Sequence, residues 1–147
     1  YVLHGELTDV EMNALYNHKK VIAHVSFTHS EGWGQPLLQA SLSGKPVFAS
    51  DWSGHLDFLS REKSVLLPGK VETIPDHLSS EYFMKGSKWF SVDYEASKKI
   101  LQDYFYGDRT EINNRAIQQS QLNSQRFNLN VMESNFHKIL DKYIRGV

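Results

Sequence analysis

The stretch HSEGWGQPLLQASLSGKPVFASD, residues 29–51, joins a glycine-rich corner to a helical apolar pattern and then to a strand-like run. Pro36 suits the first turn of a helix, because its missing N–H group would have no helical partner there anyway. Gly44 is a typical helix terminator, and Pro46 prevents the helix from continuing. The stretch therefore predicts a helix that begins at Pro36 and leads into a strand at Val47–Ser50.

Two further apolar runs flank this stretch. Val21–Phe27 (VIAHVSF) is rich in β-branched and apolar residues, which is typical of a strand buried on both faces. Ser64–Leu67 is a shorter run, closed by Pro68 and Gly69. Strands that alternate with helices favour a parallel sheet with helices on both faces. We therefore predict an α/β fold in which these two runs and Val47–Ser50 are parallel neighbours in a three-layer arrangement.

The N-terminal segment predicts one more strand and a helix. YVLHG, residues Tyr1–Gly5, is a short apolar run that ends at glycine. Thr8 can cap the following helix while Glu11 reaches back to it, which is a capping box. Lys19 and Lys20 are expected to close that helix at its negative end.

The second half of the chain predicts an irregular excursion followed by helices. Helices are expected at about Tyr94–Tyr106 and Arg109–Ser124, and a last one is capped by Asn128 or Asn130. Residues 70–92 carry an irregular pattern with several large side chains that need burial. These side chains are Tyr82, Phe83, Met84, Trp89 and Phe90. The apolar stripe of the last helix comprises Val131, Phe136, Ile139, Leu140 and Tyr143.

The composition is that of an ordinary globular domain of 147 residues, with 40% hydrophobic and 22% charged residues. The net charge of -1 gives no field that would attract nucleic acid or acidic lipid. The sequence has no cysteine, and its histidines lack a ligand spacing, so we expect no metal site. No apolar run reaches the roughly 20 residues of a membrane span, and no signal peptide is visible. We expect a cytoplasmic location, compatible with peripheral attachment of a longer protein to a membrane.

The glycine-rich corner has the chemistry of a ligand site. In open parallel sheets, ligands bind beyond the carboxyl ends of the strands, and a helix N-terminus there suits a phosphate. Gly32 and Gly34 let the backbone approach a ligand closely, and Glu31 can accept hydrogen bonds from sugar hydroxyls. The loop 51–55 is expected to face the same crevice. The alternative is a tight turn in which Glu31 is merely solvated.

The aromatic residues around the corner allow two interpretations each. Trp33 is either a stacking platform for a ligand or an anchor between the loop and the sheet. His24, in the middle of a strand, is expected to be structural. His29 and His55 lie in the right loops and are interpreted as bystanders.

The same residues resemble the signature of retaining GT-B glycosyltransferases of the "glycosyl transferases, group 1" type. That signature reads S-x-x-E-G-[FW]-G-x-P-x-x-E-A, then G-x-P-V-x-A-[ST]-D and a glycine-containing loop. Segments similar to the family's flanking elements extend the likeness over most of residues 2–67 and again after Arg126. The matching signature positions are Thr28, Glu31, Gly32, Trp33, Gly34, Pro36, Ala40, Gly44, Pro46, Val47, Ala49, Ser50, Asp51 and Gly54.

The resemblance implies a site for a nucleoside diphosphate sugar on a Rossmann-like sheet followed by C-terminal helices. Glu31 would bind hydroxyls of the donor sugar and is the residue assigned as catalytic. Backbone amides at Gly34 and Gln35 would contact the sugar or the diphosphate. The other donor-binding positions that the resemblance implies are Gly32, Pro36, Gln39, Ser53 and Gly54.

Gln39 departs from the family, which has a second glutamate at that position to bind the ribose diol. A carboxylate accepts hydrogen bonds from both ribose hydroxyls, whereas an amide accepts from one and donates to the other without charge. Charge-assisted hydrogen bonds are roughly twice as strong as neutral ones. The exchange is therefore expected to cost on the order of 1 kcal/mol of nucleotide affinity.

The resemblance also implies that residues 1–147 form a single, partial donor-binding domain. Family members have an acceptor-binding domain before it and two further strand–helix units, which carry an Arg and a Lys that neutralise the leaving diphosphate. We expect the chain to be the C-terminal part of a nucleotide-sugar-dependent glycosyltransferase that transfers a hexose with retention, without a metal or other cofactor. Two alternatives stay open: a non-catalytic nucleotide-sugar-binding or assembly module, and a Rossmann-like domain for another phosphate ligand.

The expected partners follow from the same comparison. They are a nucleoside diphosphate sugar and the acceptor-binding domain of a longer protein, without which the chain is expected to bind weakly and to transfer nothing. In the family's sheet, two strands that are absent here separate the equivalents of Tyr1–Gly5 and Val21–Phe27. An open sheet edge is a template for pairing. We therefore expect either self-association or pairing of Tyr1–Gly5 beside Val21–Phe27.

Overall fold

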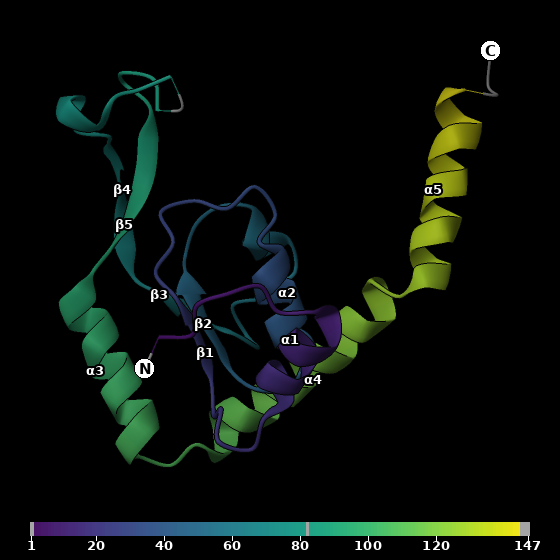
Figure 1. The fold of residues 1–147 in the computed structure, drawn as a ribbon, viewed down its shortest axis with the longest axis horizontal. Helices are drawn as coiled ribbons and strands as arrows, with labels where there is room; N and C mark the ends of the chain where they lie inside the picture. The colour runs from purple at the N-terminus through teal and green to yellow at the C-terminus, as the bar shows by residue number, and fades with distance from the viewer. Residues whose placement is uncertain (1, 82, 145–147) are drawn as a thin grey trace.

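The computed structural model describes residues 2–81 and 83–144 of the chain. Its centre is a parallel sheet in which β2 (Val47–Ser50) lies between β1 (His24–Ser26) and β3 (Val65–Leu67), as Figure 1 shows. His24 is paired with Val47, and Ser50 with Leu67. The prediction of three parallel neighbours is confirmed, although β1 and β3 are shorter than the apolar runs that indicate them.

Helix α2 (Gln35–Leu42) joins β1 to β2 and begins one residue before the predicted Pro36. Gly34 caps it in the left-handed conformation, with φ 84° and ψ 46°, which a glycine adopts at little cost. Pro36 lies in the first turn, where its missing N–H group costs no helical hydrogen bond. The predicted strand–corner–helix unit is therefore present.

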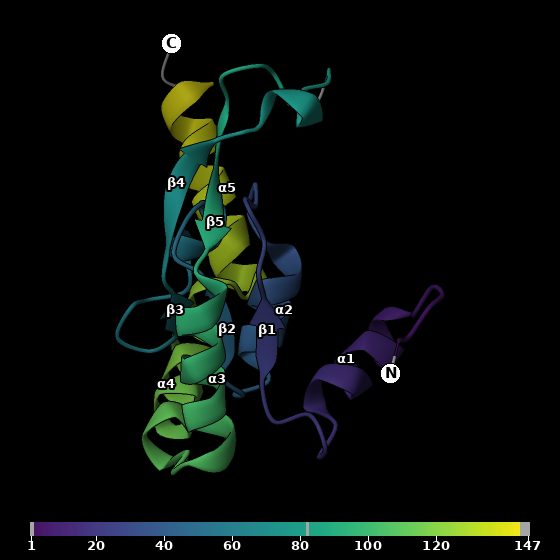
Figure 2. The same ribbon diagram turned by 90° about the vertical axis from the view of Figure 1, so that its left-hand side faces the viewer.

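Helices cover both faces of the sheet (Figures 1 and 2). Helix α3 (Tyr94–Tyr106) lies on one face, and α2 with α4 (Thr110–Arg126) lies on the other. Side chains of β2 alternate between two cores, and all four of its residues are buried. The architecture is an α/β layered fold that is compatible with part of a Rossmann-like domain. The core residues are Phe48, Leu67, Phe90, Val92 and Tyr104 on the α3 side and Leu37, Ala40, Val47, Ala49, Phe58 and Leu59 on the α2 side.

The segment 70–92 contains a β-hairpin, so the prediction of an irregular excursion is wrong. β4 (Gly69–Thr73) pairs antiparallel with β5 (Lys88–Val92), and the two strands project away from the parallel sheet (Figure 1). A short 3-10 helix, Asp76–Leu78, lies in the connection between them. The long connection hides the hairpin, because short turns give the strongest hairpin signal in a sequence.

The predicted burial of the aromatic residues in this segment is only partly correct. Phe90 is 4% exposed and anchors the base of the hairpin in the core, and Trp89 is half-buried. Phe83 and Met84 are 49% and 72% exposed, because the far end of the hairpin does not reach the core. Tyr82 lies outside the described residues.

The predicted strand Tyr1–Gly5 is wrong over the part that the structure describes, and Tyr1 lies outside the described residues. Residues 2–7 form no strand, and all of residues 2–10 are exposed. They lie with α1 (Asp9–Asn17) beyond the free side of β1 (Figure 2). An apolar run needs a paired neighbour to become a stable strand, and this segment has none.

Helix α1 begins as predicted and ends differently. Glu11 N–H donates to Thr8 Oγ1 (3.3 Å), and Thr8 N–H donates to Glu11 Oε2 (2.8 Å), so the capping box is confirmed. Lys19 and Lys20 lie beyond the last residue of the helix, so their predicted place at its end is wrong. Lys45 instead closes the helix by donating to the carbonyl oxygens of Tyr16 and His18, each at 2.7 Å.

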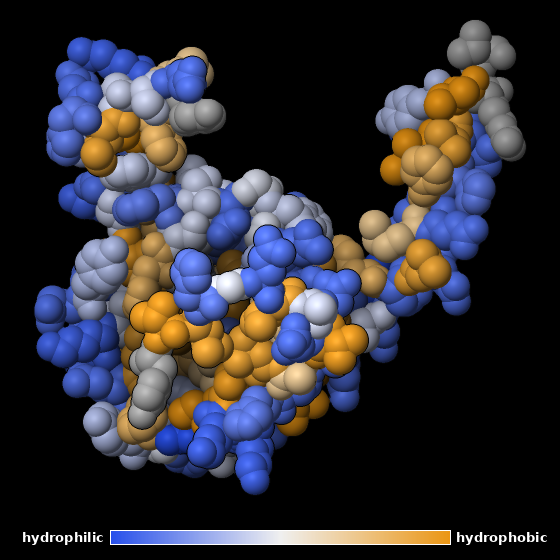
Figure 3. Space-filling view, viewed as in Figure 1, coloured by the Kyte–Doolittle hydropathy of each residue, from blue (hydrophilic) through white to orange (hydrophobic). Residues whose placement is uncertain are grey.

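The C-terminal helices match the sequence pattern closely. Helix α5 (Leu129–Tyr143) is capped by Asn128, whose Oδ1 accepts from Val131 N–H at 3.0 Å. The helix extends away from the sheet and buries none of its residues, and its apolar side chains are visible in Figure 3. Within the described part of the chain, no helix combines the length and the apolar character that a membrane crossing requires.

Candidate functional site

Two loops meet at the carboxyl ends of β1 and β2 and are joined by hydrogen bonds. Glu31 N–H donates to Ser53 Oγ (3.0 Å), and the Ser53 hydroxyl donates to the Glu31 carbonyl oxygen (2.6 Å). Gly54 N–H donates to the same carbonyl oxygen at 3.1 Å. The hydroxyl oxygens of Ser30 and Ser53 lie 3.0 Å apart. These contacts, which we call the loop lock, fix residues 28–34 against residues 51–55.

The loop lock requires glycine at position 54. A Cβ atom added there would lie 2.1 Å from the carbonyl oxygen of Gly32 and 3.0 Å from that of Glu31. A Cβ atom added at Gly32 would meet nothing within 4 Å. The second loop also holds Ser53 at φ 88°, a left-handed conformation that is unfavourable for a serine. The two loops are therefore packed backbone against backbone at Gly54 and open at Gly32.

The loop lock holds Glu31 beside the first turn of α2. Gly34 is the residue that caps the helix, and a Cβ atom added to it would lie 3.7 Å from Glu31 Cβ. The Glu31 carboxylate makes no hydrogen bond or ion pair with another residue in the ranges 2–81 and 83–144. A helix N-terminus carries partial positive charge from unpaired N–H groups. The corner thus combines a hydrogen-bond-accepting carboxylate with a local field that favours anions.

Trp33 anchors the glycine-rich loop through contacts with two aromatic rings. Its ring centroid lies 5.3 Å from that of Phe58 and 5.7 Å from that of Phe127. Phe58 belongs to the core on the α2 side, so Trp33 attaches the glycine-rich loop to the body of the domain. The side chain stays 40% exposed.

The histidines near the corner have structural contacts. His55 is fully buried, and its Nε2–H donates to the Ser50 carbonyl oxygen at 2.6 Å. His24 packs edge-on against Tyr16, and burial lowers the pKa of its ring. His55 therefore contacts the end of β2, and His24 contacts α1 from the start of β1. These contacts agree with the interpretation of His24 as structural and of His55 as a bystander.

Gln35 and Gln39 lie on the flank of α2 that faces α1. With residues of α1 that include Asp9 and Asn13, they line a polar cavity of about 320 Å³. Glu31 is not among the residues that line this cavity. The positions that the sequence assigns to one donor site therefore lie in two places. Gln35 and Gln39 lie along the adjoining helix α2. The residues that the loop lock brings together are Glu31, Gly32, Gly34, Ser53 and Gly54.

The hairpin contributes residues that the sequence does not connect with the corner. The ring of His29 stacks on Trp89, with centroids 4.1 Å apart and an angle of 9° between the planes. Phe90 N–H donates to the His29 carbonyl oxygen at 3.0 Å. A cavity of about 480 Å³ opens here, and Ser30 and Lys88 are among its lining residues. Contacts across more than fifty residues of sequence leave no local pattern, so sequence reasoning misses them.

The part of the chain that the structure describes contains no cluster of side chains suited to a metal ion. No group of three His, Cys, Asp or Glu side chains there is arranged to hold a metal ion.

No protein-family model matches the chain, and a search of curated proteins finds no relative.

Proposed function

We propose that the chain binds a nucleoside diphosphate sugar at the loop lock and forms the donor-binding part of a retaining glycosyltransferase. The observation that carries the proposal is the position of Glu31, whose backbone is fixed by Ser53 and Gly54 while its carboxylate has no hydrogen-bond or ion-pair partner among the described residues. A carboxylate accepts charge-assisted hydrogen bonds from sugar hydroxyls. The first turn of α2 suits the diphosphate.

In this proposal the chain's own residues bind and orient the donor. Glu31 accepts from hydroxyls of the hexose, and the backbone amides at Gly34 and Gln35 face the sugar or the diphosphate. Gln39 lies one helical turn further along α2, in the polar cavity beside α1, where it meets the ribose. Departure of the diphosphate is assisted electrostatically, with positive charge supplied by further segments of a longer protein.

The proposal is tested by titrating the chain with uridine, guanosine and adenosine diphosphate sugars. We expect weak, roughly millimolar binding of at least one of them, equivalent to about -4 kcal/mol, and no transfer or donor hydrolysis. Saturation-transfer NMR detects binding in this range. Absence of a signal with every diphosphate sugar would contradict the proposed function.

A control separates the diphosphate sugar from generic anion binding. Inorganic pyrophosphate contacts the helix N-terminus but offers no hydroxyls to Glu31. We therefore expect pyrophosphate to compete only partially and free hexose not to compete at all. Equal binding of pyrophosphate and the diphosphate sugars would favour the alternative of a domain for another phosphate ligand.

Gln39→Glu is expected to raise the affinity for ribonucleotides. Restoring a carboxylate replaces one neutral hydrogen bond by a charge-assisted one, worth about 1 kcal/mol or roughly fivefold in Kd. The side chain is exposed on α2, so the melting temperature should stay within about 1 °C, as for an ordinary surface substitution. The gain should vanish with 2′-deoxyribonucleotides, and a gain that is the same for both sugars would rule out the ribose contact.

A second candidate is a non-catalytic module that binds nucleotide sugars or supports assembly. The neutral Gln39 favours it, because it weakens nucleotide binding without removing the site. Normal binding together with inactivity of any longer polypeptide that carries the chain would favour this candidate. A cytoplasmic location fits both candidates and is part of the proposal.

A further inference from the structure

The corner and the hairpin enclose a cavity of about 480 Å³, which we call the hairpin cavity. Its walls are formed by residues 27–30, which follow β1, and by residues 74, 83 and 87–89 of the hairpin. Figures 1 and 2 show the hairpin beside the corner, and Phe90 N–H joins the two by its hydrogen bond to the His29 carbonyl oxygen. Ser30 lines the cavity and Glu31 does not. The volume lies in the range of small-molecule sites, about 300–1,000 Å³, so the hairpin cavity is a second candidate site next to the loop lock.

Two aromatic side chains of the hairpin meet at a steep angle where they line this cavity. The ring centroids of Phe83 and Trp89 are 6.3 Å apart, and the ring planes make an angle of 76°. His29 stacks flat on Trp89 and holds its ring in place, while Phe83 keeps an exposed surface, and Figure 3 shows apolar surface at the far end of the hairpin. A flat nucleobase stacks with its face on one ring, whereas the C–H groups of a puckered sugar ring can contact two inclined aromatic surfaces. The two rings therefore favour a saccharide over a nucleobase.

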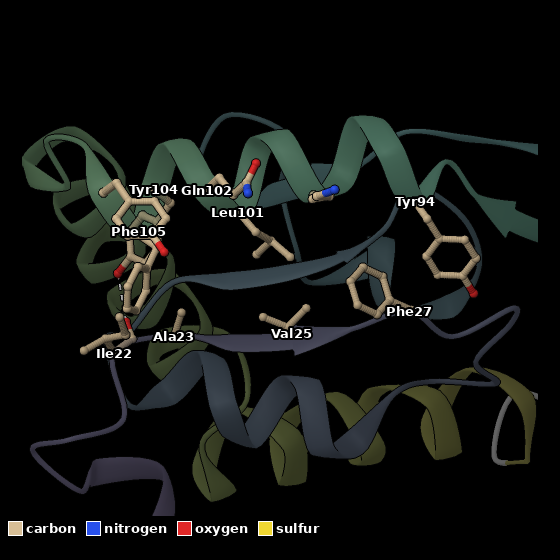
Figure 4. A pocket seen from close by; sticks show the side chains of 11 residues that line it. Ile22, Ala23, Val25, Phe27, Tyr94, Leu101, Gln102, Tyr104 and Phe105 are labelled. Atoms are coloured by element: carbon tan, nitrogen blue, oxygen red, sulfur yellow. Dashed lines mark hydrogen bonds between the residues drawn. The ribbon is translucent and has the colours of Figure 1, made fainter.

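Other lining residues supply apolar surface and a free hydroxyl group. Ile74 is 3% exposed, and Phe27 is the residue that follows β1. Figure 4 shows the side chain of Phe27 beside Tyr94, with ring centroids 5.7 Å apart and an angle of 63° between the planes. Phe27 also lines the larger groove between β1 and α3, so its ring stands between the two hollows. The Ser87 hydroxyl makes no hydrogen bond to another residue in the ranges 2–81 and 83–144, which leaves it for a sugar hydroxyl.

Lys88 brings a positive charge to the cavity that no carboxylate of the described chain neutralises. The other two lysines of the hairpin are paired, Lys70 with Glu72 at 3.0 Å and Lys85 with Asp76 at 2.9 Å. Lys88 forms no ion pair with any residue that the structure describes, and none of the described residues that line the cavity is an aspartate or a glutamate. An anionic group on a ligand would gain a charge-assisted hydrogen bond from this ammonium group. The cavity therefore combines surfaces for a sugar ring with a place for a negative charge.

We propose that the hairpin cavity binds an acidic saccharide, that is, a sugar ring that carries a carboxylate or a phosphate group. The ring packs against Phe83 and Trp89, its hydroxyl groups reach Ser87, and its anionic group pairs with Lys88. Selectivity for this class of ligand requires both parts, because the aromatic rings contact any sugar and the lysine attracts any anion. The inference goes beyond the proposed donor site and does not depend on it, because neither Glu31 nor the N-terminus of α2 lines this cavity.

The test is an NMR titration of the isotope-labelled full chain with glucuronate and with glucose 6-phosphate. We expect the amide signals of Ser87, Lys88 and Trp89 to shift with at least one of these ligands. Its Kd should be at least about tenfold lower than that of glucose, because the anionic group adds a charge-assisted hydrogen bond. The ligand that binds more tightly identifies the anionic group as a carboxylate or a phosphate. Absence of shifts at these three residues with both ligands, or an equal affinity for glucose or for inorganic phosphate, overturns the proposal.

Lys88→Met tests the role of the charge. Methionine keeps much of the length of the side chain, and the loss of the ammonium group should raise the Kd for the acidic saccharide at least about tenfold, to that of glucose. Lys85→Met is the matched control, because Lys85 is an exposed lysine of the same hairpin that is paired with Asp76 and does not line the cavity. K85M should bind like the unaltered chain. An equal loss of affinity in both variants means a general attraction between charges and overturns the proposal.

Phe83→Ala tests the contact with the sugar ring, and it decides the case in which Lys88→Met fails to fold, as judged by circular dichroism. The side chain is 49% exposed, so its removal should leave the fold intact. We expect the Kd for the acidic saccharide to rise about fivefold, because an aromatic contact of about 1 kcal/mol is lost. An unchanged Kd overturns the proposal.

The positions of the shifted signals separate this site from the proposed donor site. A diphosphate sugar at the loop lock should shift the amide signals of Gly34 and Ser53, whereas an acidic saccharide should shift those of residues 87–89. Failure of the donor site is therefore seen independently of failure of the hairpin cavity. Shifts confined to Gly34 and Ser53 on addition of the acidic saccharide place it at the loop lock and overturn the proposal.

Discussion

Gly54→Ala is expected to lower the free energy of unfolding by about 2–4 kcal/mol and to abolish ligand binding at the corner. The added Cβ atom would lie 2.1 Å from the Gly32 carbonyl oxygen, which belongs to backbone and cannot rotate away. The two loops must separate, and the hydrogen bonds of Ser53 and Gly54 to Glu31 are then lost. At about 2–4 °C per kcal/mol, the melting temperature should fall by roughly 5–15 °C.

Gly32→Ala is the matched control for this prediction. The same methyl group is added in the same loop lock, but it meets nothing within 4 Å. The melting temperature should therefore stay close to that of the unaltered chain, while binding weakens if the ligand occupies the open space at Gly32. Equal stability of the Gly54→Ala and Gly32→Ala chains would show that the loops are not held together as described.

The parallel sheet is predictable from sequence because its signals are local. Pro36 and Gly44 mark the ends of one helix, and Val47–Ser50 is an apolar run too short to be anything but a strand. Alternation of such units leaves few topologies open. The prediction therefore depends on the spacing of turn residues and on apolar runs, both of which are visible in a single sequence.

The hairpin and the N-terminal segment are not predictable in the same way. β4 and β5 are separated by a connection with Pro75 and Gly86, which interrupts any alternating pattern. Val2 and Leu3 have the composition of a strand, yet they are 90% and 73% exposed. A strand depends on the neighbour with which it pairs, and a neighbour far away in the chain, or absent from it, leaves no local signal.

In the candidate site, too, the local features are predictable from the sequence and the long-range contacts are not. The helix N-terminus, the glycines and Glu31 follow from one short motif. Ser53, by contrast, contacts Glu31 across 22 residues of sequence, and the stacking of His29 on Trp89 depends on where the hairpin folds back. The residues that give the corner its chemistry are thus neighbours in the sequence, whereas the contacts that make it rigid come from the tertiary structure.

Glu31→Ala is expected to remove most of the donor affinity while leaving the fold intact. Hydrogen bonds to a charged group contribute about 1.5–3 kcal/mol, which corresponds to a loss of roughly 10- to 150-fold in affinity. A chain that starts from millimolar binding should then give no saturation-transfer signal. In a longer polypeptide that transfers hexose, kcat/KM should fall by at least the same factor if the proposed contact of the carboxylate with the sugar persists in the transition state.

Stability should respond differently, because the loop lock uses the backbone of Glu31 and not its side chain. Losing a negative charge beside the N-terminus of α2 costs no more than about 0.3–1 kcal/mol, so the melting temperature should fall by only a few degrees. Glu111→Ala is the matched control, since Glu111 is an exposed carboxylate in the first turn of α4. It should leave binding unchanged and lower the melting temperature by the same few degrees, because it too removes a negative charge from the first turn of a helix. Undiminished binding of the donor by the Glu31→Ala chain would mean that the carboxylate does not contact the ligand, and the corner would then be only a turn between β1 and α2.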